Sequence, residues 1–298
     1  MKKIFALILL SSTFITSLSY ILPDNRPVTI AILAKDKGQS TLALYLECIK
    51  HQTFSKKNTY LYIRTNNNND NTAQMLKDWI AREGYQYLGV YFDDSDVKER
   101  VQDYAQHEWN CTRFKVLGRI RQESMDWAYA HGSHYFVADC DNFILPNTLE
   151  DLIAVNLPIV APLLYSNNAY SNYHSAIDIN GYHIPCPQYL TILNREIKGL
   201  IELPVVHCTY LVRYEYLPLM TYDDESYRYE YVIFSDNARK KGISQYLDTR
   251  QVYGNLTLCD TAQELLEEPW YNDFIAKLYK TVLVSQDKIS TYENIVNN

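Results

Sequence analysis

Residues 134–146 read HYFVADCDNFILP, and this stretch decides both the fold and the chemistry that the sequence predicts. An apolar run from Tyr135 to Ala138 ends in two carboxylates, Asp139 and Asp141. In an extended segment side chains alternate between faces, so residues two apart point the same way. We therefore expect the two carboxylates to hold one divalent cation, Mg²⁺ or Mn²⁺, through oxygen. Such a cation neutralises a diphosphate leaving group, as transfer from a sugar nucleotide requires.

A second pair of aspartates, Asp94 and Asp96, also follows an apolar run, from Leu88 to Phe92. Pairs with this spacing arise by chance, and a bare pair is more often a solvated turn than a metal site. The spacing alone does not decide between the two pairs, so support must come from the rest of the chain.

The composition is that of an ordinary globular protein. The chain has 298 residues, of which 47% are hydrophobic and 21% are charged. This length suffices for one large domain or two small ones. The formal net charge of -7 argues against nucleic acid as a partner, because phosphate binding requires a basic face.

The N-terminus has the layout of a secretory signal peptide. Lys2-Lys3 precedes an apolar run from Ile4 to Leu10, and small residues follow at Ser17-Leu18-Ser19. The apolar run is short for a membrane span, although an uncleaved anchor is the alternative. We interpret residues 1–19 as the signal peptide. The mature chain is then expected in a secretory or periplasmic compartment, without a membrane span.

Six cysteines are compatible with disulfide bonds in such a compartment, and pairing them all allows fifteen connectivities. Their spacing contains no Cys-X-X-Cys pair, so a zinc site is not expected. Sequons for N-glycosylation begin at Asn110 and Asn255 and would matter only in a eukaryotic host.

Apolar runs alternate with helix-like segments in the first half of the chain. Strands are predicted at residues 28–33, 59–63, 87–92 and 135–138, and helices at 40–49, 72–80 and 114–129. The alternation indicates an α/β sheet with parallel strands. Ligands of such sheets sit beyond the carboxyl ends of the strands, where Lys35-Asp36 and both aspartate pairs lie.

The second half is more irregular. The run from Leu157 to Leu164 contains two prolines and is consistent with an edge strand or extended segment. The run from Leu203 to Val212 is strand-like around His207, and residues 231–241 are predicted to be helical. We interpret the Asn66-Asn69 run as a surface loop. A capping box at residues 261–264 begins an amphipathic helix in the tail.

Several blocks, in this order along the chain, resemble the procollagen galactosyltransferase family. They are ILAK at 32–35, DNTAQML at 70–76, DCDN at 139–142, PIVAPL at 158–163, YSNY at 170–173 and LPVVH at 203–207. The resemblance is to the N-terminal glycosyltransferase module of these enzymes, and more distantly to the glycosyltransferase domain of the multifunctional lysyl hydroxylases. It covers residues 28 to 254.

The resemblance implies a GT-A fold, which is a Rossmann-like α/β domain of nucleotide-diphospho-sugar transferases. We assign this single domain to residues 28–258 and a short helical tail to 259–298. The resemblance further implies a UDP-hexose donor (UDP-galactose in the family), Mn²⁺ as cofactor, and a protein acceptor such as hydroxylysine in collagen-like sequence. It places the chain in the endoplasmic reticulum lumen or among secreted proteins.

The same resemblance assigns roles to single residues on the donor side. Asp139 and Asp141 match the family's metal-binding pair. Lys35 and Asp70 match positions on the nucleotide side of the cleft, and the alternative for both is an ordinary exposed charge on a loop.

Two further residues match blocks on the acceptor side, namely Asn172 and His207. A histidine inside an apolar run is otherwise most simply a hydrogen-bonded core residue.

The chain departs from the family at two positions. Where the family carries paired acids before an apolar helix, this chain has Tyr229-Glu230, with further acids nearby at 223–225. The family's histidine before a Tyr-Gly step is replaced by Gln251. We take Glu230 as the candidate general base for the acceptor hydroxyl. The alternative for Glu230 is a surface acid at the start of the following helix.

These observations predict metal-dependent transfer of a hexose, galactose first of all, from a UDP-sugar to a protein hydroxyl. The altered acidic pair and the replaced histidine, whose loss would weaken a metal site that uses it, motivate one alternative: a catalytically inactive carbohydrate-binding or adhesion-type relative. A transferase that uses another UDP-sugar and another acceptor is the second.

Overall fold

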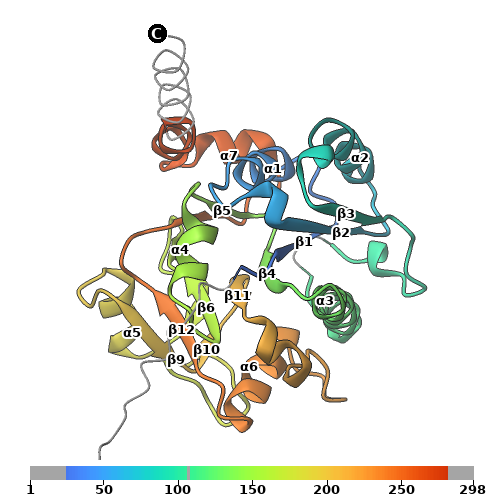
Figure 1. Cartoon of the computed structure of the whole chain (residues 1–298). Coiled ribbons are helices and arrows are strands. Elements are labelled where there is room, and N and C mark those ends of the chain that lie inside the picture. The colour runs from blue at the N-terminus through green and yellow to red at the C-terminus, as the bar shows by residue number, and fades with distance from the viewer. Residues whose placement is uncertain (1–24, 106–107, 281–298) are drawn as a thin grey trace, which may run out of the picture.

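An eight-stranded mixed sheet runs through the middle of the protein (Figure 1). The computed structural model describes residues 25–105 and 108–280, so the signal peptide predicted at 1–19 and the end of the tail lie outside the described residues. In spatial order the strands are β3 (Gly89–Asp93), β2 (Thr59–Thr65), β1 (Val28–Ala34), β4 (His134–Ala138), β11 (Thr209–Val212), β6 (Ile159–Pro162), β12 (Gln245–Asp248) and β9 (Leu200–Leu203).

Two small sheets accompany the large one. They are formed by β10 (Val205–Val206) with β8 (Tyr173–His174), and by β5 (Asn142–Ile144), β13 (Gly254–Leu256) and β7 (Leu164–Tyr165). The α-helices are α1 (Leu42–Lys50), α2 (Thr72–Glu83), α3 (Cys111–Ala130), α4 (Thr148–Ala154), α5 (Pro187–Leu193), α6 (Glu230–Lys240) and α7 (Ala262–Glu267). Short 3₁₀ helices occur at Lys56–Asn58, Gly84–Gln86, Val101–Asp103 and Tyr214–Leu219.

The first half of the sheet is parallel, as the alternating pattern predicts. Strand β1 pairs in parallel with β2 and with β4, and β2 pairs in parallel with β3. Side chains alternate along β1, so Ile30 and Ile32 face the core under α1 and α2, whereas Ala31 faces the core under α3 and α6. Helices therefore cover both faces, as Figure 1 shows. This burial explains why β1 reads as a continuous apolar run.

The second half of the sheet differs from the prediction in one respect. The segment from Leu157 to Leu164, predicted to be an edge strand or an extended segment, contains β6, which lies inside the sheet between β11 and β12. Its two prolines are tolerated because Pro158 precedes the strand and Pro162 is its last residue. Neither removes a hydrogen-bond donor from the middle of the ladder.

The run from Leu203 to Val212 is broken rather than continuous. Strand β9 ends at Leu203 and β11 begins at Thr209, and Cys208 between them has a left-handed backbone conformation with φ of 63°. Because β11 is antiparallel to β4, its first residue lies opposite Ala138 at the end of β4. The break therefore brings His207 and Cys208 to the edge of the sheet where the Asp139 pair begins.

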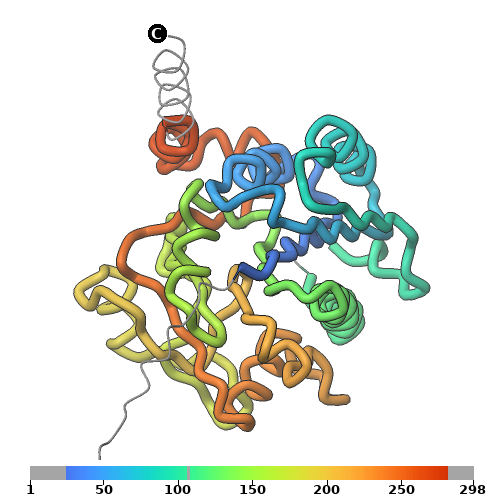
Figure 2. The backbone as a smooth tube through the Cα atoms, in the orientation of Figure 1, coloured from blue at the N-terminus to red at the C-terminus, as the bar shows by residue number. Residues whose placement is uncertain are grey.

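The described part of the tail, residues 259–280, packs against the body of the protein. The predicted capping box is confirmed, because Thr261 and Glu264 exchange both hydrogen bonds at the start of α7. Residues 271–280 are helical, and Phe274 of this segment lies 6.2 Å from the ring of Phe143. Figure 2 shows this C-terminal segment beside α1, where the rings of His51 and Tyr279 are 5.3 Å apart.

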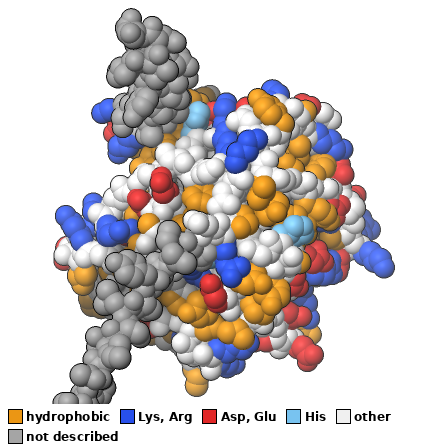
Figure 3. Space-filling view, viewed as in Figure 1, with side chains coloured by type: hydrophobic (Ala, Val, Ile, Leu, Met, Phe, Trp, Pro, Cys, Tyr) orange, Lys and Arg blue, Asp and Glu red, His pale blue; other side chains and the backbone are white. Residues whose placement is uncertain are grey.

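Two findings concern the surface. Over the residues that the structure describes, no helix is both long and apolar enough to cross a bilayer. On the face drawn in Figure 3, acidic and basic side chains are interspersed rather than gathered by sign.

All six cysteines lie in the described ranges, and none of them is paired in a disulfide there.

Candidate active site

A cavity of about 380 Å³ lies at the carboxyl ends of β1 and β4. This volume is within the range of pockets that bind small ligands. Five of the seven residues singled out in the sequence line it, namely Lys35, Asp139, Asp141, His207 and Glu230. The other two, Asp70 and Asn172, are not among its lining residues.

The two carboxylates lie in the turn between β4 and β5. The backbone N–H of Asn142 donates to the carbonyl of Asp139 at 2.9 Å, which closes this turn. Each carboxylate is paired with a cation: Asp141 Oδ2 lies 3.1 Å from Lys37 Nζ, and Asp139 Oδ1 lies 2.5 Å from Arg121 Nη2. Burial alone would lower the pKa of Lys37, but Asp141 and Asp139 raise it above its ordinary value.

Arg121 joins the two halves of the site, and the sequence reasoning missed it. Its side chain is 4% exposed, and its Nε lies 3.4 Å from Glu230 Oε1 while Nη2 contacts Asp139. Within the described residues, Arg121 Nη1 has no hydrogen-bond partner although it is buried. The sequence held a signal, because Arg121 interrupts the buried stripe of α3 between Gly118 and Met125. A charge on such a stripe requires a buried partner of opposite charge.

Glu230 is the first residue of α6 and is only 4% exposed. It is therefore not a surface acid, although it does begin the helix. Burial raises the pKa of its carboxyl to about 7, against the opposing effect of Arg121. A Cβ added at Gly118 would lie 3.3 Å from Glu230 Cβ, so the glycine lets α3 approach α6 closely. A carboxyl with a pKa near neutrality suits general base catalysis.

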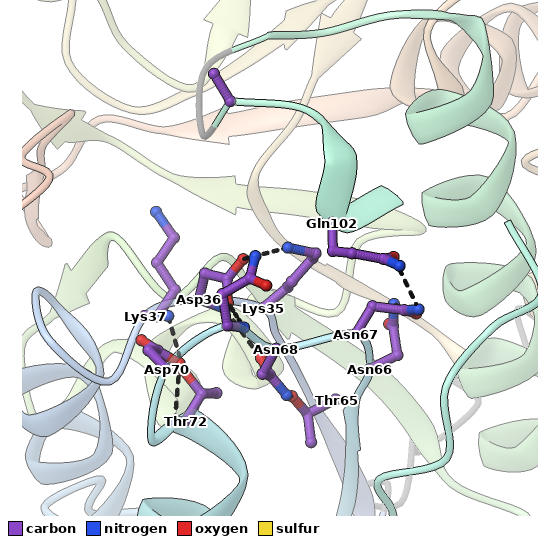
Figure 4. A network of polar contacts seen from close by, with 12 residues as sticks. Lys35, Asp36, Lys37, Thr65, Asn66, Asn67, Asn68, Asp70, Thr72 and Gln102 are labelled. Carbon is purple, nitrogen blue, oxygen red and sulfur yellow. Dashed lines mark hydrogen bonds and ion pairs between the residues drawn. The ribbon is translucent and has the colours of Figure 1, made fainter. Parts of the chain in front are cut away.

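A network of amides holds the loop after β1, as Figure 4 shows. Asp36, with φ of 51°, lies between Lys35 and Lys37, and its backbone N–H donates to Asn68 Oδ1 at 3.0 Å. The prediction of a surface loop for the Asn66-Asn69 run is wrong in part: Asn66 and Asn67 are buried. Their amides find partners inside the network, so burying them leaves few polar groups unsatisfied.

Asp70 does not line the cavity but supports this loop. Its Oδ2 accepts from the backbone N–H of Gly38 at 2.9 Å, and its Oδ1 accepts from that of Thr72 at 2.9 Å. Asp70 therefore accepts a hydrogen bond from a backbone N–H at the start of α2, where Asn71 makes no side-chain capping bond. Through Gly38 it also fixes the backbone that follows Lys37.

The two residues matched to the acceptor side differ in position. Asn172 is fully buried: its Oδ1 accepts from Leu164 N at 3.2 Å and its Nδ2 donates to Pro162 O at 2.8 Å. His207 lines the cavity, with Nδ1 2.8 Å from Cys208 Sγ. Burial lowers the pKa of His207 well below its ordinary value, and His174 and Arg121 add to this effect. The imidazole is therefore neutral at pH 7.

The remaining candidates lie elsewhere. Asp94 pairs with Lys77, and Asp96 accepts from the backbone of Asn67, so the second aspartate pair is not part of the cavity lining. The acids at 223–225 are also absent from the lining, as is Gln251, whose amide donates to Asp151 at 2.9 Å. The two aspartate pairs have the same spacing, but the fold places only Asp139 and Asp141 in the cavity.

The donor set of the cavity fits a hard divalent cation that shares its ligands with phosphate groups. Among the described residues, no cluster of three Asp, Glu, His or Cys side chains forms a protein-only metal site. Mg²⁺ and similar ions are commonly bound by one or two carboxylates together with substrate phosphates. Asp139 and Asp141 supply such a pair, and Lys35, Lys37 and Arg121 supply positive charge for the phosphates.

The fold is the GT-A fold found in solved glycosyltransferases. Staphylococcus aureus TarS (residues 1–349) is similar in structure with a TM-score of 0.51 and 12% identity, over 85% of this chain and 72% of that one. GalNAc-T7, solved with UDP, GalNAc and Mn²⁺, is similar with a TM-score of 0.54 and 15% identity, over 78% of this chain and 43% of that one. At these identities the likeness concerns the fold alone.

The sequence profile described as glycosyltransferase family 25, N-terminal domain, matches residues 25–275, and the chain belongs to this family. Human procollagen galactosyltransferase 2 is 30% identical over 251 residues, which are 81% of this chain and 40% of that protein. The mouse inactive glycosyltransferase 25 family member 3 is 28% identical over 276 residues, 89% of this chain and 46% of that protein. The chain thus spans less than half the length of these relatives.

Proposed function

We propose that the chain transfers a hexose, galactose first of all, from a UDP-sugar to a protein hydroxyl such as that of hydroxylysine in collagen-like sequence. The observation that carries this proposal is the buried Arg121, which contacts both Asp139 and Glu230 in one cavity. It connects a carboxylate suited to a metal–diphosphate complex with a carboxylate suited to proton abstraction. The family and its procollagen galactosyltransferase members support the choice of donor and acceptor.

On the donor side, Asp139 and Asp141 would hold Mn²⁺. When bound, the cation neutralises charge that develops on the leaving UDP. Lys35 directly follows β1 and Lys37 lies in the loop after it, and both bring positive charge to the same diphosphate. Arg121 Nη1, which is buried and has no partner among the described residues, is a further donor for a phosphate oxygen.

On the acceptor side, Glu230 acts as the general base. It takes the proton of the acceptor hydroxyl while the oxygen forms a bond to C1 of the sugar and the bond from C1 to the diphosphate oxygen breaks. UDP then leaves with the electron pair of that bond. Transfer from α-linked UDP-galactose to a β-linked product inverts C1, and inversion in one step calls for one base.

The test is UDP release with a panel of UDP-sugars, with and without Mn²⁺, in the presence of a hydroxylysine peptide. Release that requires UDP-galactose, Mn²⁺ and peptide supports the proposal. Release with another UDP-sugar would instead support a transferase of different specificity.

A second candidate is an inactive relative that binds carbohydrate, as the inactive family members among the relatives suggest. Tyr229, which stands where the family has an acid, favours it: its ring stacks on Phe114 at 3.9 Å and supplies no carboxylate. Binding of UDP-sugar without any turnover would support this candidate.

A further inference from the structure

A second cavity, of about 810 Å³, adjoins the first. It lies mainly among residues 169–190, and it shares Tyr170 and Tyr231 with the cavity that contains Glu230. Because Tyr231 directly follows Glu230 on α6, a molecule in the second cavity would lie next to the candidate base.

The lining of this second cavity contains no charged side chain among the described residues. It is instead rich in aromatic rings, with five tyrosines at positions 170, 173, 182, 189 and 231 and two histidines at 174 and 183. Tyr189 stacks on Tyr173 at 4.7 Å, and it is half-buried, so part of its ring is free to contact a ligand. Aromatic faces without carboxylates or guanidinium groups suit an uncharged, ring-bearing ligand.

One buried polar atom in this wall has no partner. His174 is 7% exposed, and its Nδ1 makes no hydrogen bond to any described residue. Its ring lies 5.1 Å from that of His183 and 5.1 Å from that of His207. Burial and His183 lower the pKa of His174 to about 4, so the ring is neutral at pH 7 and its Nδ1 either donates or accepts one hydrogen bond. Buried polar groups are rarely left unpaired, so this nitrogen is available to pair with an atom of a ligand.

We propose that the second cavity binds the proline-containing, extended stretch of an acceptor peptide beside the hydroxyl that receives the sugar; this rests on the proposed function. Proline-rich segments in polyproline II conformation dock in aromatic-lined grooves. Their backbone has no internal hydrogen bonds, so a carbonyl is available to His174. The hydroxylated side chain passes Tyr170 and Tyr231 to reach Glu230.

The direct test is peptide binding measured by calorimetry in the presence of UDP, with a Gly-Pro-hydroxylysine repeat peptide and the same peptide with alanine for proline. Tyr189→Ala is expected to weaken binding of the proline peptide about tenfold, since one aromatic contact is worth up to about that factor. Tyr189→Phe keeps the ring and should bind like the wild type. Tyr85→Ala removes a tyrosine that is 77% exposed and outside both linings, and it serves as the matched control. UDP affinity should not change in any variant.

Equal affinity of wild type and Tyr189→Ala for the proline peptide would overturn the proposal, as would equal affinity for the proline and alanine peptides. Binding of lactose that is lost in Tyr189→Ala, with peptide binding unaffected, would place a sugar in the cavity instead and overturn it too. Peptide binding that depends on Tyr189 in a protein that releases no UDP would uphold the peptide site and refute the proposed function.

Discussion

Replacing Arg121 by methionine tests whether one guanidinium holds the two carboxylates of the site. The substitution keeps an unbranched side chain in α3 but removes the charge 2.5 Å from Asp139 and 3.4 Å from Glu230. Because the side chains of Arg121 and Glu230 are only 4% and 5% exposed, the substitution leaves Glu230 without a compensating charge in a buried setting. Breaking a buried ion pair in this way costs about 3–5 kcal/mol of unfolding free energy. We expect this full loss at pH 8.

The loss should be smaller at pH 5. The pKa of Glu230 is already about 7 with Arg121 present, and removing Arg121 raises it further. A raised pKa means that the folded state binds a proton that the unfolded state releases, so the variant loses stability as pH rises from about 5 to 8. At pH 5 the protonated Glu230 needs no counter-charge, and we expect a loss of about 1–2 kcal/mol for the missing hydrogen bond from Arg121 to Asp139.

The assay is urea unfolding at both pH values. Arg119→Met is the matched control, because Arg119 lies on the same helix and pairs at 2.7 Å with Glu99, but its side chain is 46% exposed. An exposed pair of this kind contributes about 0–1 kcal/mol. A loss for Arg121→Met that equals that of Arg119→Met, or that does not depend on pH, would refute the reasoning.

Two further substitutions address the same site. Glu230→Gln should lower the rate of UDP release about 10²–10⁴-fold while UDP still binds. The wild-type rate should rise with pH through about 7, where Glu230 ionises, and the variant should lack this rise; an unchanged rate would exclude Glu230 as the base. Gly118→Ala gains up to about 1 kcal/mol of helix propensity, but its Cβ would lie 3.1 Å from Tyr222 O and 3.3 Å from Glu230 Cβ. We expect a free energy of unfolding within about 1 kcal/mol of the wild type, measured by thermal unfolding, and slower UDP release. A variant with unchanged stability and full activity would show that α6 need not approach α3 so closely.

The local elements of the first half of the fold were predictable from the sequence because three of its strands, β1, β2 and β4, are buried on both faces and read as apolar runs. An apolar run that ends in a polar step, as Ala138-Asp139 does, marks both a strand and its carboxyl end. The order of strands in the second half was not predictable. Strand β6 lies inside the sheet because β11 and β12 pair with it, and these long-range pairings leave no local pattern.

The residue pattern by itself predicted the site only where its residues follow a strand. Asp139, Asp141 and Lys35 do so, and they line the cavity. Arg121 arrives from the middle of a helix and Lys37 from a loop shaped by Asp36 and Asp70, so tertiary packing decides their positions. The resemblance to a family located Glu230 on the chain, but its burial and its ion pair with Arg121 follow from the packing of α3 against α6.

The central claim is that Asp139 and Asp141 hold a divalent cation against the diphosphate of a sugar nucleotide. Calorimetry of UDP binding with and without Mn²⁺, for the wild type and for the variant with asparagine at both positions, tests it most directly. We expect the wild type to bind UDP at least about tenfold more tightly with Mn²⁺ present, and the double variant to lose this difference. UDP affinity that is the same with and without Mn²⁺ in the wild type, or a Mn²⁺ effect that persists in the double variant, would contradict the claim.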